Sequence, residues 1–219
     1  MLLEIFAGLQ AFGTVAVFVA AIWGDQIRAK LAPPKLRVEP PDPKGLRITQ
    51  FIRPEESDGR TMQQVQKTIQ SRWYFLPVTN EKRFPPAHEV QVVIASLEEE
   101  GPDRYPREIF RIPLPLTWRN QRDLDPRPWR TVGGRFLEAD LLSVREDGRL
   151  QFSPVVPLNN FPGTYTKPVV LWATVQALSL EGVSRPLRLK IAWDGKWEEG
   201  DTEMANHLRI VPDPTNAPL

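Results

Sequence analysis

The chain has 219 residues, with 28 Lys and Arg against 27 Asp and Glu, so its formal net charge at neutral pH is +1. This balance provides no overall field to recruit nucleic acid, and the absence of cysteine excludes disulfides, thiol nucleophiles and cysteine-ligated metals. The 23 prolines argue against a mainly helical domain, because proline removes a backbone donor and clashes inside a helix.

An uncharged apolar run lies near the start of the chain, at residues 5–23. A helix rises about 1.5 Å per residue, so this run would extend roughly 28 Å, close to the hydrocarbon thickness of a bilayer. A cleaved signal peptide and a buried core helix are the alternatives, but no Lys or Arg precedes the run and only Gln10 and Thr14 interrupt it. We therefore expect residues 1–30 to form a transmembrane anchor with a basic flank.

The charges beside this run predict its orientation. Arg28, Lys30, Lys35 and Arg37 follow the run, whereas only the amino terminus and Glu4 precede it. Because cytoplasmic flanks carry an excess of Lys and Arg, the C-terminal domain is expected in the cytoplasm.

Small residues recur along the predicted span. Gly13, Ala16, Ala20 and Gly24 fall at helical spacings of three and four, which would form one narrow face that another helix could approach closely. This face is a candidate for transmembrane helix packing. The alternative is that small residues are simply common in membrane helices.

A proline-rich stretch at residues 31–45 is expected to be an extended spacer, in which residues 36–39 could already form an edge strand. The folded domain is then expected at residues 46–212, followed by a flexible tail at 213–219. Apolar and polar residues alternate in short segments that predict strands at residues 46–53, 72–80, 90–94, 110–118, 135–144, 150–153, 169–180, 187–193 and 208–211.

These strands, with turns between them and no helix longer than about two turns, predict a mainly β fold. We expect an antiparallel immunoglobulin-like β-sandwich behind a single N-terminal transmembrane helix, with a jelly roll or an open barrel as the alternative. Pro77, in the second predicted strand, indicates an edge that is unpaired. Asp201 is expected to cap a short helix at residues 201–206.

Three sequence blocks carry a resemblance: WYFLPVTN at 73–80, PAHEVQV at 86–92 and IAWDGKWEEGDTEMA at 191–205. Together with the N-terminal anchor, they resemble a group of bacterial membrane-anchored proteins of unassigned function. The resemblance implies the same architecture. It implies no reaction, cofactor or site residue.

No pattern for catalysis or metal binding stands out. His88 and His207 have no partner at metal-ligand spacing, and no serine lies in a G-x-S-x-G turn. The acidic residues between Asp194 and Glu203 do not match a calcium loop. We therefore expect no catalytic, cofactor or metal site.

Two of the seven tryptophans are expected in loops beside charged residues. Trp129 with Arg130, and Lys196 with Trp197, are the candidate partner contacts, because exposed tryptophan is enriched at binding surfaces. Structural packing is the alternative for each of them. Trp73 fits a strand position and is expected in or near the core.

The sequence as a whole favours a non-enzymatic protein-interaction module, a scaffold or an accessory subunit of a membrane complex, anchored in the inner membrane. Its expected partners are the lipid bilayer and another protein or a second copy of the chain, without nucleic acid. An extracytoplasmic polysaccharide-binding domain using Trp129 and Trp197 is the alternative. A hydrolase that uses Asp194 or Asp201 is a third hypothesis.

Overall fold

The computed structural model describes residues 33–52, 67–82, 85–121, 129–156 and 158–213. Within these residues no helix combines the length and the apolarity that a membrane crossing requires. The predicted span at residues 5–23 lies outside the described residues, as do Gly13, Ala16, Ala20 and Gly24.

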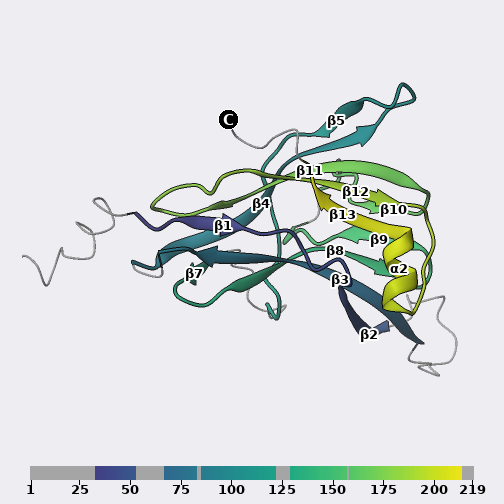
Figure 1. The fold of residues 1–219 in the computed structure, drawn as a ribbon, viewed down its shortest axis with the longest axis horizontal. Coiled ribbons are helices and arrows are strands. Elements are labelled where there is room, and N and C mark those ends of the chain that lie inside the picture. Colours follow the sequence, from purple (N-terminus) through teal and green to yellow (C-terminus); the bar gives the residue numbers. More distant parts are fainter. Residues whose placement is uncertain (1–32, 53–66, 83–84, 122–128, 157, 214–219) are drawn as a thin grey trace, which may run out of the picture.

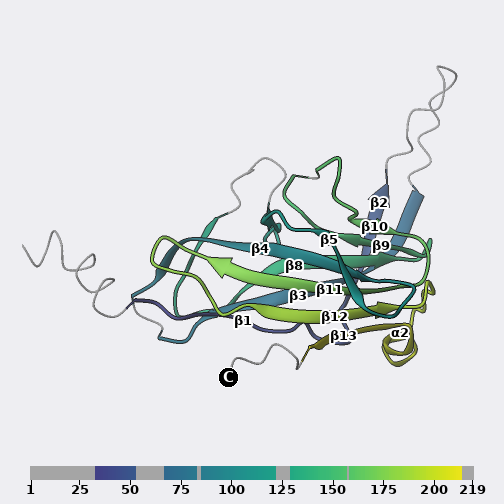
Figure 2. The ribbon, with the colours of Figure 1, turned by 90° about the horizontal axis from the view of Figure 1, so that it is seen from above.

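Two antiparallel sheets lie face to face, which confirms the predicted mainly β sandwich (Figures 1 and 2). The first sheet has the order β1-β3-β8-β9-β10, with β2 also paired to β3. The second has the order β13-β12-β11-β4-β5, with β6 and β7 also paired to β4. The first sheet consists of β1 (Leu36–Val38), β2 (Leu46–Ile52), β3 (Lys67–Asn80), β8 (Leu137–Arg145), β9 (Arg149–Phe152) and β10 (Thr164–Tyr165).

The second sheet consists of β4 (Ala87–Glu100), β5 (Pro106–Phe110), β6 (Leu114–Pro115), β7 (Arg130–Val132), β11 (Val169–Leu178), β12 (Leu187–Trp193) and β13 (Leu208–Pro212). A short helix, α2 (Asp201–His207), connects β12 to β13 and lies beside one end of the sandwich (Figure 1). Residues 36–38, within the proline-rich stretch, form β1 and pair with the end of β3.

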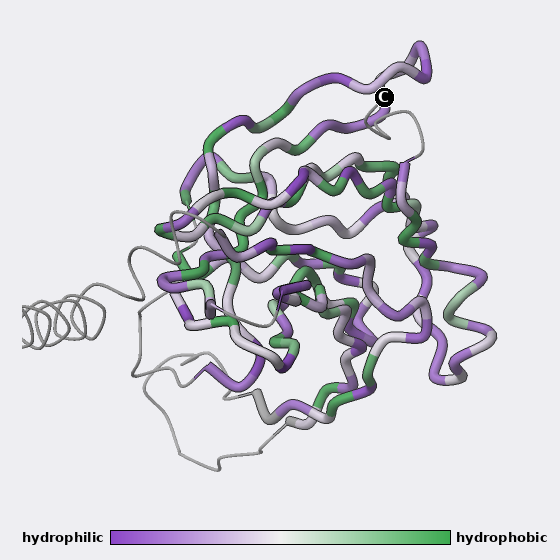
Figure 3. The backbone as a smooth tube through the Cα atoms, turned by 60° about the vertical axis from the view of Figure 1, so that its left-hand side comes forward, coloured by the Kyte–Doolittle hydropathy of each residue, from purple (hydrophilic) through white to green (hydrophobic). Residues whose placement is uncertain are grey.

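The core lies between the sheets and follows the period-two pattern of the strands. In β12 the side chains of Leu189, Ile191 and Trp193 are buried, while Arg188 and Lys190 face outward, as the alternation predicts. Hydrophobic residues lie along the strands in the middle of the molecule, and many of the outer turns are hydrophilic (Figure 3). Burying each of these apolar side chains contributes roughly 1.5–3 kcal/mol to the stability of the fold. The alternation along the strands therefore largely decides which face of each sheet packs against the other sheet.

The prediction that Pro77 marks an unpaired edge is wrong. Pro77 lies between β1 and β8, aligned with Glu138 of β8, and its carbonyl accepts a hydrogen bond of 2.9 Å from the backbone N–H of Glu39. Proline lacks only the donor, so its carbonyl still joins β3 to the chain beside it.

A fully buried arginine connects β3 to the C-terminal part of the chain. Arg72 has 0 % of its side chain exposed, and Nη1 donates to Asp201 Oδ1 and to the carbonyl of Lys44, both at 2.6 Å. Its Nη2 donates to the carbonyl of Glu199 at 2.7 Å. One guanidinium therefore joins β3, the β1–β2 connection and the start of α2.

The prediction that Asp201 caps the helix is also wrong. The N-cap residue is Gly200, which forms no side-chain capping hydrogen bond, and Asp201 is the first residue of α2. The hydrogen bond from Arg72 and the charge of its guanidinium lower the pKa of Asp201. A buried cation needs a compensating carboxylate, and Asp201 supplies it.

Replacing this arginine tests its role in stability. Arg72→Met keeps an apolar stem but leaves the carbonyls of Lys44 and Glu199 without their donor, so we expect a loss of about 3 kcal/mol in the free energy of unfolding. Urea titration of the purified full chain, followed by tryptophan fluorescence, measures this change. The matched control is Arg47→Met on the neighbouring strand, where a solvent-exposed ion pair with Glu199 is lost, and a change below about 1 kcal/mol is expected. Equal effects of the two substitutions would contradict the assigned role.

Candidate functional site

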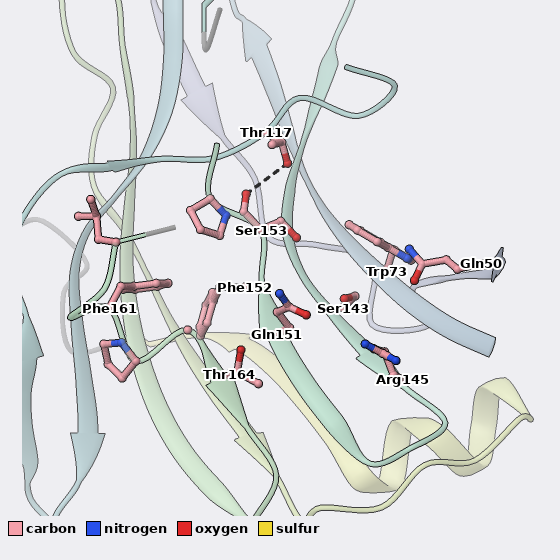
Figure 4. Close-up of a pocket in the computed structure, with 14 residues that line it drawn as sticks. Gln50, Trp73, Thr117, Ser143, Arg145, Gln151, Phe152, Ser153, Phe161 and Thr164 are labelled. Atoms are coloured by element: carbon pink, nitrogen blue, oxygen red, sulfur yellow. Dashed lines mark hydrogen bonds between the residues drawn. The ribbon is translucent and has the colours of Figure 1, made fainter. Parts of the chain in front are cut away.

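A hollow of about 520 Å³ lies over the outer face of the first sheet and reaches the edge of the core at Phe152 and Phe161 (Figure 4). It is bounded by β2, β3, β8, β9 and β10 and by the connection that leads from β9 to β10. The lining residues are Gln50, Trp73, Thr117, Ser143, Arg145, Gln151, Phe152, Ser153, Pro154, Leu158, Phe161, Pro162, Gly163 and Thr164.

Strand register builds the floor of the hollow. Trp73 of β3 is paired with Ser143 of β8, Ser143 with Gln151 of β9, and Gln151 with Thr164 of β10. Directly paired residues point to the same face of a sheet, and neighbouring strands lie about 4.8 Å apart, so this row extends roughly 14 Å across four strands. The row presents an indole, a hydroxyl, an amide and a second hydroxyl in that order.

Aromatic rings bound the hollow on two sides. The ring of Trp73 stacks on Phe75 with 6.4 Å between centroids, and its Nε1 donates to Ser71 Oγ at 3.3 Å. On the opposite side Phe161 meets Phe152 edge to face, with 6.0 Å between centroids (Figure 4). These contacts hold the walls in place while the polar row between them faces outward.

The segment that follows β6 closes one edge of the hollow. The backbone N–H of Thr117 donates to the carbonyl of Ser153 at 3.0 Å, and the N–H of Asp140 donates to the carbonyl of Thr117 at 2.8 Å. The hydroxyl of Thr117 lies 3.1 Å from Asp140 Oδ2 and 3.2 Å from the Ser153 carbonyl. Asp140 is thus the carboxyl group directly behind this edge.

Burial raises the pKa of Asp140 to about 6. The hydrogen bond from Thr117 and the charge of Arg119 oppose this increase, whereas the charge of Glu138 adds to it. A threonine hydroxyl has a single proton, so it cannot donate to Asp140 and to the Ser153 carbonyl at once. Below about pH 6, where Asp140 is protonated, it can donate to Thr117, which then donates to the carbonyl of Ser153.

The chemistry of the lining is that of a binding surface. Arg145, which forms an ion pair of 3.1 Å with Asp147, is the one charged side chain among the lining residues, and the others offer hydroxyls, amides and rings. Such neutral groups orient a polar ligand by hydrogen bonds, while rings contact its apolar parts. Among the residues that the structure describes, no group of three or more His, Cys, Asp or Glu is placed to hold a metal ion.

The structure does not bring the sequence-predicted contact residues together. Trp129 is exposed and precedes Arg130, the first residue of β7, which pairs with the start of β4. Lys196 and Trp197 lie between β12 and α2, and Trp197 is partly buried against the core. The C-terminal end of β12 pairs with the start of β11. The start of β11 pairs in turn with the C-terminal part of β4. The two pairs therefore lie at opposite ends of the sandwich (Figure 1).

The histidines and the acidic C-terminal stretch lie away from the hollow. His207 Nδ1 is 2.7 Å from Asp194 Oδ2, beside a second hollow of about 520 Å³ on the other sheet. Burial alone would raise the pKa of Asp194, but the hydrogen bond from His207 and the backbone N–H of Lys196 lower it. The backbone N–H of His88 donates to the Glu181 carboxylate at 3.0 Å.

Sequence reasoning assigned Trp73 to the core region and did not find the hollow. Its members are far apart in the chain, and only their pairing makes them neighbours. A weak signal was available in Ser143, a polar residue inside the apolar strand Leu137–Arg145, which is 6 % exposed although it faces outward.

Comparison of this chain with known family models, characterised proteins and solved structures finds no match in any of the three. The two antiparallel sheets agree with the sandwich that the three sequence blocks imply.

The carboxyl group behind the hollow makes stability depend on pH. Because the pKa of Asp140 is raised in the folded state, its ionisation costs folding free energy above about pH 6, and that cost disappears as the pH falls to about 4. Asp140→Asn cannot ionise and keeps a donor for Thr117. We expect it to stabilise the protein by about 3 kcal/mol at pH 8 and to make no difference near pH 4, because the pKa rises from 3.8 to about 6 and one pKa unit corresponds to about 1.4 kcal/mol.

Urea titrations at the two pH values measure this difference. The control is Glu146→Gln on the exposed turn that follows β8, for which no such pH-dependent gain is expected. A loss of stability of Asp140→Asn at pH 8 would show that the ionised carboxylate is favoured in the fold.

Proposed function

We propose that this chain is a membrane-tethered, non-enzymatic binding module, a scaffold or an accessory subunit of a membrane complex. In this proposal a transmembrane helix at residues 5–23 holds an immunoglobulin-like sandwich on the cytoplasmic side of the inner membrane. The partner is another protein or a second copy of the chain. The observation that carries the proposal is the row of neutral polar groups between aromatic walls on the outer face of the first sheet.

The row suits an extended segment of a partner protein. Its length of roughly 14 Å corresponds to about four residues of an extended chain, at about 3.3 Å per residue. Ser143, Gln151 and Thr164 offer both donors and acceptors, which match the N–H and C=O groups of a peptide backbone. The Trp73 ring provides apolar area for a side chain of that segment, and Arg145 lies where a partner carboxylate would find a cation.

A substitution that fills the hollow tests the proposal. Gln151 is exposed at the centre of the row, so Gln151→Arg adds bulk and charge without disturbing the core. We expect the tagged full chain, purified from detergent-solubilised membranes, to recover a stoichiometric protein partner, and we expect Gln151→Arg to lose most of it. The matched control is Thr202→Arg, at an exposed position of α2, which should retain the partner.

Two results would contradict the proposal. Recovery of no stoichiometric partner by the unaltered chain would remove the interaction module itself. Full retention by Gln151→Arg, together with loss on Trp129→Ala or Trp197→Ala, would move the contact to the residues that the sequence suggested.

A polysaccharide ligand is the second candidate, because amides and hydroxyls beside a tryptophan ring also suit a sugar. Trp73 favours this candidate, whereas Trp129 and Trp197 lie at opposite ends of the sandwich and cannot form one platform (Figure 1). A polysaccharide outside the cell requires the opposite membrane orientation.

Protease accessibility separates the two candidates. We expect the sandwich to resist added protease in intact spheroplasts and to be cleaved only after the membrane is permeabilised, because the basic flank favours a cytoplasmic domain. Cleavage in intact spheroplasts would favour the polysaccharide candidate.

A further inference from the structure

Described residues from four parts of the chain meet at one end of the sandwich, which we name the proximal end: 33–36, 80–82 with 85–87, 133–136 and 179–186. The start of β1 pairs with the end of β3, and Ala87 pairs with Val132 next to the β7–β8 turn. The backbone N–H of Leu180, in the β11–β12 hairpin, donates to the carbonyl of His88 at 3.1 Å. These segments lie together on the left in both ribbon views (Figures 1 and 2). The described chain begins here, at Pro33.

The proximal end exposes large apolar side chains. Phe136, Leu180 and Val183 have between 61 % and 69 % of their surface exposed, although each follows or precedes a strand whose apolar residues are buried. Isolated exposed apolar residues are ordinary, but three in adjoining turns at one end indicate a surface that meets an apolar phase.

Basic side chains surround these apolar residues. The described residues of these segments include four exposed cations, Lys35, Lys82, Arg135 and Arg185, and two carboxylates, Glu81 and Glu181. Both carboxylates already have partners: Glu81 lies 2.5 Å from Lys35 Nζ, and Glu181 accepts from the backbone N–H of His88 at 3.0 Å. The proximal end is therefore basic, which favours contact with anionic lipid headgroups.

The opposite end of the sandwich, which we name the distal end, carries an acidic stretch. Residues 194–203, between β12 and the first turn of α2, contain five carboxylates, Asp194, Glu198, Glu199, Asp201 and Glu203, and one cation, Lys196. Glu199 and Asp201 are paired with Arg47 and Arg72, and an anionic surface would not attract the other carboxylates of this stretch. Apolar exposure and positive charge thus coincide at the proximal end, and negative charge gathers about 45 Å away, the length of the 14-residue strand β4.

The predicted anchor lies shortly before the proximal end in the sequence. Between Trp23, where the predicted span ends, and Pro33 lie ten residue steps, which reach at most about 35 Å when fully extended. The tether therefore keeps the proximal end near the bilayer.

We propose that the proximal end rests on the bilayer surface, with Phe136, Leu180 and Val183 in the headgroup region and the surrounding Lys and Arg on anionic lipid phosphates. This inference rests on the membrane tether of the proposed function. Apolar side chains flanked by cations bind an anionic interface in two ways: the apolar area is buried, and the cations are attracted to the anionic lipids. The lipid surface then fixes the orientation of the sandwich and leaves the distal end turned away.

Single-site fluorescent labelling tests this contact on the full chain, because the sequence contains no cysteine and each introduced cysteine is unique. Gly182 and Gly133 are suitable positions, since a β-carbon there would have no neighbour within 4 Å and no apolar contact residue is replaced. Thr202→Cys on α2 is the distal control. The labelled chains are reconstituted in phosphatidylglycerol–phosphatidylcholine vesicles that contain phosphatidylcholine with a nitroxide near the headgroup.

We expect the nitroxide to quench most of the fluorescence from the probes at 182 and 133 and to leave the probe at 202 nearly unchanged. Adding Leu180→Asp and Val183→Asp to the chain labelled at 182 should remove most of that quenching. Uniformly weak quenching in chains that stay with the vesicles after an alkaline wash would overturn the bilayer contact and leave the tether intact. Release of the unaltered chain into the supernatant by that wash would overturn the tether, and the contact with it.

Discussion

The guanidinium of Arg72 is the constraint on which the distal end of the structure depends. A cation with no exposed surface must be compensated within the protein, and three separate parts of the chain supply the acceptors. Only one of these acceptors carries a negative charge. It is the carboxylate of Asp201, whose side chain is 61 % exposed, and the other acceptors are backbone carbonyls. Directional polar contacts thus fix α2 against the first sheet, whereas the space between the two sheets is filled mainly by apolar side chains.

The same arginine links the fold to the candidate binding surface. Arg72 and Trp73 are adjacent on β3, so their side chains point to opposite faces of the sheet. As long as Arg72 is held inward, Trp73 must face outward and stay aligned with Ser143 on β8. A shift of one residue would exchange the two faces and bury the indole in place of the cation. The floor of the hollow therefore depends on a contact made on the other side of the sheet.

Sequence patterns predicted the parts of this fold that depend on local alternation. The clean period of β12 and the long apolar run of β11 correspond to observed strands, because one buried face imposes a period of two. The prediction of an unpaired edge at Pro77 was wrong because it considered only the missing backbone N–H. The carbonyl of Pro77 still accepts a hydrogen bond from the neighbouring chain. The row from Trp73 to Thr164 was beyond prediction, since it exists only through register between strands separated by up to ninety residues. The charge of Arg72 within an apolar strand was a usable signal for a buried ion pair.

The short strand β1 determines how the domain would carry a mechanical load. Its hydrogen bonds to β3 run across the strand axis, and the side chains of Leu36 and Val38 are inserted in the core. A pull on the chain at Pro33, opposed by a protein held on the outer face of the first sheet, acts along β1. All of its hydrogen bonds then resist in shear at the same time, whereas a peeling force would break them one after another. This attachment suits a domain that is loaded along the axis of its first strand.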